Sequence, residues 1–96
     1  MNEQRDIMKT IKDKTYSFNH TQKRLKVRHN IDITREEYDN LCYVIKNIKD
    51  EPVHIEKKQD DVQKIYEIVF KNKEIICVWS EKRQLITTAL VYYNGD

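Results

Sequence analysis

The sequence predicts an α+β fold in which two or three N-terminal helices pack on a four-stranded antiparallel sheet. Apolar residues recur at helical spacing up to about residue 50, and four short runs of β-branched and aromatic residues follow. With 96 residues, the chain suits a single domain. We expect one domain over 1–96, with an N-terminal helix or arm at 1–14, a helical part at 17–50 and the sheet at 53–93.

The first helical segment covers residues 3–14, where three apolar residues lie among charges. A helix of under four turns needs a packing partner to persist. Ser17 is a suitable N-cap for a second helix, which we expect to run to about His29. Asn30 suits the left-handed position that ends a helix, because Asn tolerates positive φ better than most residues.

Thr34 and Glu37 form a capping box at the start of the next helix, and apolar residues follow at helical spacing. This helix should end near Asp50, because Pro52 disfavours the helical conformation in the residue before it. The chain then changes to strand patterns. We expect strands at Val53–Lys57, Val62–Phe70, Glu74–Ser80 and Leu85–Tyr93. Their short polar connections imply antiparallel neighbours, with the helices on one face of the sheet.

Positive charge is concentrated in the first third of the chain. Residues 1–35 carry nine Lys or Arg and four Asp or Glu, a net charge of +5, whereas residues 36–96 carry nine and twelve, a net charge of −3. This asymmetry favours a phosphate-bearing partner, and a solvated helix surface is the alternative. Without an apolar run of about 20 residues or a signal-peptide core, we expect a cytoplasmic protein with no membrane segment.

Composition also argues against several kinds of site. Cys42 and Cys77 each lie among apolar neighbours, so we expect buried free thiols and no disulfide. The histidines and cysteines lack the close spacing of zinc ligands, and we predict no metal and no cofactor. A Gly-rich phosphate loop is excluded, because Gly95 is the only glycine.

Three basic side chains form the strongest candidate site. His20, Arg24 and Arg28 are spaced at i, i+4 and i+8, so a helix would place them on one stripe beside Thr21 and Leu25, the side expected to face the sheet. Cleavage of RNA by its own 2′-hydroxyl needs a proton acceptor and cations around the phosphate, which imidazole and guanidinium groups can supply. The alternative for His20 is an ordinary surface histidine.

Side chains near the C-terminus form a second group of candidates. Thr87 and Thr88 should face opposite sides of the last strand, so at most one can border a given groove. Tyr92, Tyr93 and Trp79 could stack on bases, although large aromatic residues in a small domain usually build the core.

The segment from His20 to Ile31 reads His-Thr-x-x-Arg-Leu-x-x-Arg-His-Asn-Ile, and the last strand contains Leu-Ile-Thr. Together with the order of elements, these motifs resemble the small RelE-like and colicin-type ribonuclease domains of the barnase-EndoU-colicin-RelE superfamily. Many members are bacterial toxins that cut RNA without a metal, and some are encoded by phages or prophages. The resemblance implies catalytic roles for His20, Arg24, Arg28 and Thr87, with Lys23 and Tyr92 as candidate RNA-binding residues, and it implies an antitoxin or immunity protein as partner.

The chain departs from that family in three ways. An extra residue and Asn30 stand where the family has the glycine that ends the helix, and the strands carry unusually few glycines. The net charge of +2 is also low for a ribosome-dependent nuclease. A metal-independent endoribonuclease that acts on free RNA or tRNA, or an inactive relative of the family, therefore fits better than a ribosome-dependent enzyme. Two alternatives remain open: a non-enzymatic phage or bacterial protein that binds nucleic acid or a host protein through the basic first third, and a purely protein-binding module.

Overall fold

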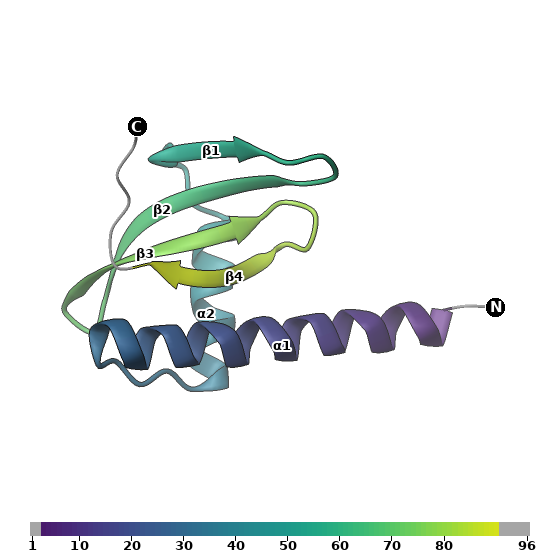
Figure 1. Ribbon diagram of the computed structural model, residues 1–96, viewed down its shortest axis with the longest axis horizontal. Coiled ribbons are helices and arrows are strands. Elements are labelled where there is room, and N and C mark those ends of the chain that lie inside the picture. The colour runs from purple at the N-terminus through teal and green to yellow at the C-terminus, as the bar shows by residue number, and fades with distance from the viewer. Residues whose placement is uncertain (1–2, 91–96) are drawn as a thin grey trace.

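A computed structural model describes the backbone of residues 3–90 and the side chains of residues 14–90. Two helices precede a four-stranded antiparallel sheet, which confirms the predicted α+β fold (Figure 1). The elements, in chain order, are α1 (Glu3–His29), α2 (Arg35–Lys46), β1 (His54–Lys57), β2 (Val62–Phe70), β3 (Lys73–Ser80) and β4 (Leu85–Leu90).

The sheet is a meander with the strand order β1-β2-β3-β4, as the short connections predicted. Lys71 and Asn72 join β2 to β3 with φ angles of 52° and 65°. Positive φ at both central residues is typical of the tight turn whose twist matches a hairpin. The predicted strand boundaries agree within one residue, except that residues 91–93, assigned to the last strand from the sequence, lie outside the described part of the chain.

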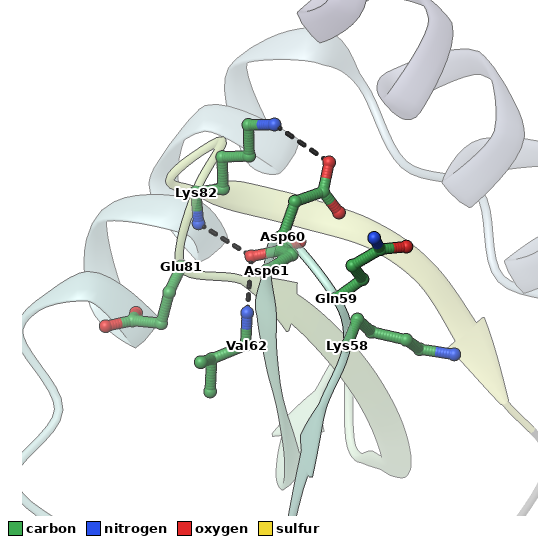
Figure 2. Close-up of a pocket in the computed structure, with 7 residues that line it drawn as sticks. All are labelled: Lys58, Gln59, Asp60, Asp61, Val62, Glu81 and Lys82. Atoms are coloured by element: carbon green, nitrogen blue, oxygen red, sulfur yellow. Dashed lines mark hydrogen bonds and ion pairs between the residues drawn. The ribbon is translucent and has the colours of Figure 1, made fainter.

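The β1–β2 and β3–β4 turns are joined at one end of the sheet by Asp61 (Figure 2). Its Oδ1 accepts hydrogen bonds from the backbone N–H groups of Val62 and Lys82, at 2.7 and 2.9 Å, and its Oδ2 accepts one from Ser80 Oγ at 2.6 Å. Burial alone would raise the pKa of Asp61, but these donors hold the pKa below its ordinary value. Asp61 therefore fixes the two hairpins relative to each other as a carboxylate.

The first helix is longer than predicted. The sequence suggested separate helices before and after Ser17, with Ser17 as an N-cap, but α1 is continuous from Glu3 to His29. No Gly or Pro interrupts this stretch, and Ser17 is buried in mid-helix at 2% exposure. Burial of the side chain on the core-facing side of the helix, and not a capping role, accounts for a small residue at this position. Asn30 ends the helix with φ 54°, as predicted.

The second helix begins as predicted and ends earlier. Thr34 and Glu37 form the reciprocal capping box, with distances of 2.8 and 3.1 Å. The helix ends at Lys46, four residues before the predicted end near Asp50, and the Asn47 side chain donates to the Tyr43 carbonyl oxygen at 2.8 Å. This amide satisfies one of the carbonyl groups that a helix end leaves without a partner, so the helix can stop before the proline exerts its effect.

Helix side chains satisfy the backbone of β4, which is the last strand of the sheet. The Tyr38 hydroxyl donates to the carbonyl oxygen of Ile86 at 2.6 Å, and the N–H of Ile86 lies 3.5 Å from Cys42 Sγ. At the other end of β4, Arg28 Nη1 donates to the Ala89 carbonyl oxygen. These contacts give buried polar groups of an edge strand the partners that a fifth strand would otherwise supply.

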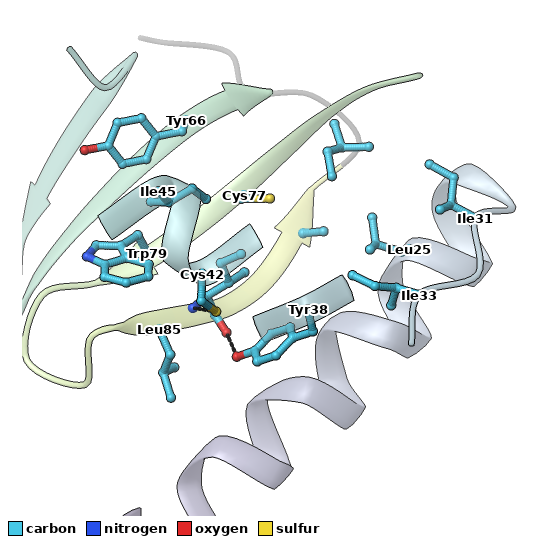
Figure 3. Packing of buried hydrophobic residues seen from close by; sticks show 13 residues of the cluster. Leu25, Ile31, Ile33, Tyr38, Cys42, Ile45, Tyr66, Cys77, Trp79 and Leu85 are labelled. Carbon is cyan, nitrogen blue, oxygen red and sulfur yellow. Dashed lines mark hydrogen bonds between the residues drawn. The ribbon is translucent and has the colours of Figure 1, made fainter. Parts of the chain in front are cut away.

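The main core lies between the helices and one face of the sheet (Figure 3). Its fully buried members include Leu25 from α1, Tyr38 from α2 and Ile75 from β3, each at 0% exposure. Trp79 belongs to this core at 2% exposure, so its role is packing and not base stacking. A smaller cluster on the opposite face consists of Ile65, Ile76 and Val78, with Leu90 packed against them.

The two cysteines are free and buried, as the sequence predicted. Burial raises the pKa of Cys77 to about 12, so this thiol stays protonated at neutral pH. Among the residues that the structure describes, no helix has the length and apolar character needed to cross a membrane.

Candidate nucleic-acid interface

The candidate site lies on α1, beside the stripe that the helix buries. Ser17, Thr21 and Leu25 are at most 2% exposed, which identifies the side of the helix that faces the core. His20 and Arg24 directly precede Thr21 and Leu25, so they flank the buried stripe and remain half-buried. The prediction that Thr21 and Leu25 border the sheet is therefore confirmed.

We call His20, Lys23, Arg24 and Arg28 the basic row. Arg28 fixes one end of the basic row to the sheet, because its Nη1 donates to the Ala89 carbonyl oxygen at 2.9 Å. The neighbouring His29, the last residue of α1, also contacts β4, with Nε2 3.0 Å from the Leu90 carbonyl oxygen. A guanidinium has five N–H donors, so this bond leaves Arg28 further donors for a ligand.

His20 lies at the other end of the basic row, next to an aromatic ring. The rings of His20 and Tyr16 are nearly parallel, with an interplanar angle of 7° and a centroid distance of 6.3 Å. Partial burial lowers the pKa of His20 below its ordinary value, and the positive charges of Arg24, Arg28 and Lys23 lower it further. The imidazole is therefore neutral at pH 7 and able to accept a proton.

The cations of the basic row lack carboxylate partners among the residues whose side chains the structure describes. Seven ion pairs connect other residues, and two of them use lysines of α1 outside the row, Lys14 with Asp39 and Lys26 with Asp32. Lys23 and Arg24 appear in none of them. Two unpaired positive charges next to a neutral imidazole form an arrangement suited to a phosphate group.

Thr87, the other predicted catalytic residue, uses its hydroxyl within the sheet. Thr87 is half-buried at an irregularity of the β3–β4 ladder, where Val78 pairs with Thr88 and Trp79 pairs with Ile86. The Thr87 hydroxyl donates to the Val78 carbonyl oxygen at 3.3 Å, so its proton is used within the sheet. Tyr92, predicted to bind RNA, lies outside the described residues.

A depression of the described surface lies away from the basic row. It has a volume of about 420 Å³ and is lined by residues of the β1–β2 and β3–β4 turns, around Asp61 (Figure 2). These turns are at the end of the sheet away from the C-terminus of α1 (Figure 1). The polar atoms of Asp61 are already bonded within the fold, so this depression is explained by hairpin structure. No group of three or more His, Cys, Asp or Glu side chains within the described part of the chain is arranged to hold a metal ion.

Tyr16 was missed by sequence reasoning although a signal existed. It precedes His20 by four residues, the spacing at which helical side chains meet. The prediction of Ser17 as an N-cap placed Tyr16 outside the helix, and the spacing was therefore not considered.

Comparison with known proteins gives no further identification: no protein-family model, curated protein or solved structure matches this chain.

Proposed function

We propose that the protein is a metal-independent endoribonuclease that cleaves RNA through attack of the 2′-hydroxyl on the adjacent phosphate. The observation that supports this most is the environment of His20, a neutral imidazole beside Arg24 and close to cations that no described carboxylate neutralises. A general base must be deprotonated at the working pH, and a phosphate must find positive charge.

In the proposed reaction, a ring nitrogen of His20 accepts the proton of the 2′-hydroxyl. The 2′-oxygen then forms a bond to phosphorus as the bond to the 5′-oxygen breaks. The leaving 5′-oxygen takes a proton from the imidazolium or from water, which yields a 2′,3′-cyclic phosphate and a 5′-hydroxyl. Arg24 and the free donors of Arg28 offset the negative charge that develops on the phosphate oxygens, and Lys23 binds a neighbouring phosphate. Thr87 has no step in this scheme.

The proposed substrate is free RNA or tRNA. The basic row supplies few phosphate contacts, and the remaining two thirds of the chain carries a net negative charge. Electrostatic attraction therefore contributes little affinity for a large polyanion such as the ribosome. For a toxin of this type, the partner we propose is an antitoxin or immunity protein that covers the basic row.

The test is cleavage of total bacterial RNA in excess chelator by the wild-type protein and by His20→Ala. We expect discrete fragments with 2′,3′-cyclic phosphate ends from the wild type, and a rate lower by about 100- to 10,000-fold for the variant, the range of general acid–base catalysis. Asn19→Ala is the matched control, because Asn19 is exposed on the same helix outside the basic row.

Equal rates for His20→Ala and the wild type would remove His20 from the mechanism. A loss of rate in the Asn19→Ala control would show that the assay responds to damage of the helix and not to the imidazole.

One observation favours a second function, RNA binding without cleavage. The basic row lies on the convex surface of a helix, one donor of Arg28 is bonded to the sheet, and the depression around Asp61 is lined by other residues. Such a surface can bind phosphates without enclosing a reacting group. RNA that is bound in a strongly salt-dependent way and stays intact would support this function over the enzyme.

A further inference from the structure

Tyr16 is a large aromatic side chain that the fold itself does not use. Its exposed fraction is 69%, whereas the core aromatic residues Tyr38 and Trp79 are at 0% and 2%. Its one described ring contact is the parallel arrangement with His20, which holds the Tyr16 ring against the basic row and leaves most of its surface in water.

The continuous helix makes Tyr16 part of a single line of side chains. Tyr16, His20, Arg24 and Arg28 follow one another at intervals of four residues, each about 6 Å further along the axis of α1. Along this line the side chains pass from the exposed Tyr16 to the half-buried Arg28, which is fixed to β4. An aromatic ring, an imidazole and two guanidiniums thus follow one another in this order. No acidic residue lies in the line.

We propose that the ligand of this line is single-stranded RNA, with one unpaired base stacked on the Tyr16 ring while the adjoining phosphates lie along His20, Arg24 and Arg28. This inference rests on the proposed function and specifies its substrate class. Aromatic side chains beside a basic track are the means by which proteins bind single strands, because every base has a face that can stack.

The same geometry discriminates against a duplex. Paired bases are stacked on each other inside a double helix, so the Tyr16 ring can reach a base face only where the strand is unpaired. A duplex keeps its contacts with the cations of the row and loses the contact with the ring. The protein therefore selects loops, bulges and unpaired ends.

The test measures binding of a fluorescent single-stranded RNA, of the same strand in a duplex, and of the same strand made abasic, using a non-cleavable RNA with 2′-O-methyl groups. The proteins are the wild type, Tyr16→Ala, Tyr16→Phe and Tyr43→Ala. Tyr43 is the control because it is equally exposed, at 70%, and lies on α2.

We expect Tyr16→Ala to weaken single-strand binding by about 5- to 150-fold, the range that base–aromatic stacking provides, while duplex and abasic binding change by less than twofold. Tyr16→Phe should retain wild-type affinity, since the ring and not the hydroxyl makes the contact. Tyr43→Ala should bind like the wild type.

The inference and the proposed function can fail separately. If the wild type binds the single strand and Tyr16→Ala binds it equally well, the stacking site is wrong and the ribonuclease proposal is untouched. If Tyr16→Ala weakens duplex and abasic binding as much as single-strand binding, the effect is not stacking and the inference is also wrong. If the wild type binds none of the three ligands, both proposals are overturned.

Discussion

His20 owes its properties to partial burial and to cations on its own helix. Partial burial beside the core-facing stripe lowers its pKa, and Arg24 and Arg28 lower it further because a second positive charge nearby disfavours protonation. The basic row thereby supplies both the cations that a phosphate needs and the condition that keeps the imidazole neutral. A lysine at position 20 would add only positive charge, and a carboxylate would supply only a proton acceptor.

A pH dependence follows from the direction of that shift. Because the free protein must hold His20 deprotonated, the acidic limb of kcat/KM should have its midpoint below pH 6.5, the ordinary histidine value. Arg24→Gln removes one of the charges that lower the pKa, so the midpoint should move upward in this variant as the maximal rate falls. The measurement is cleavage rate against pH at constant ionic strength. A midpoint above 6.5 in the wild type would contradict the described environment.

The free energy of unfolding should change with pH in the same direction as kcat/KM on its acidic limb. The folded state protonates His20 less readily than the unfolded state, so below pH 6.5 the unfolded chain binds more protons and the free energy of unfolding decreases as the pH falls.

The alignment of His20, Arg24 and Arg28 could be predicted from the sequence because it depends only on helical periodicity. The environments of Tyr16 and Thr87 were harder to predict, for different reasons. Whether Ser17 caps a helix or lies inside one depends on the burial of its side chain, which is a tertiary property. The position of Thr87 at an irregularity of the ladder depends on how β4 pairs with β3, and spacing along the chain does not report that.

At the scale of the elements, β4 pairs with β3, and its backbone also forms hydrogen bonds with helix side chains. Tyr38 and Cys42 on α2 contact the carbonyl and N–H groups of Ile86, and Arg28 on α1 contacts the carbonyl of Ala89. An edge strand with partners of this kind is protected from pairing with another chain. The helix that carries the basic row is consequently fixed to the sheet at its C-terminal end.

Tyr38→Phe tests this arrangement. The substitution removes the hydroxyl that donates to the buried carbonyl of Ile86 and should lower the free energy of unfolding by about 1–3 kcal/mol, the cost of leaving a buried polar group without a partner. Tyr43→Phe, at an exposed position on the same helix, should change stability by less than about 0.5 kcal/mol. Urea unfolding followed by circular dichroism provides the measurement. Equal midpoints for the two variants would mean that the Tyr38 hydroxyl bond contributes nothing.

Element types and most boundaries were predictable because the periodicity changes clearly from helix to strand near residue 50. The end of α2 was placed too late, because the effect of Pro52 extends only to the residue before it, whereas the cap by Asn47 acts earlier. The division of α1 into two helices was wrong for a different reason. Ser17 is a residue type suited to capping, and this was given more weight than the absence of any helix-breaking residue.

For the whole molecule, the distribution of charge follows the fold. Residues 1–35, with net charge +5, include α1 and the connection to α2, and residues 36–96, with net charge −3, include nearly all of α2 and the sheet. A phosphate-bearing ligand is therefore attracted to one helix and not to the molecule as a whole. This electrostatic steering attracts a phosphate-bearing ligand more strongly to the basic row than to the scattered lysines of the sheet. It weakens as salt screens the charges.

The most direct test of the account is to map the surface that RNA contacts. We would record amide chemical shifts of the ¹⁵N-labelled chain during titration with a short, non-cleavable single-stranded RNA. The account predicts that the largest shift changes fall in α1 between Tyr16 and His29, with smaller changes in the adjoining residues of β4. Changes concentrated at the depression around Asp61, or on the outer face of α2, would contradict the assignment of the basic row as the RNA-binding surface.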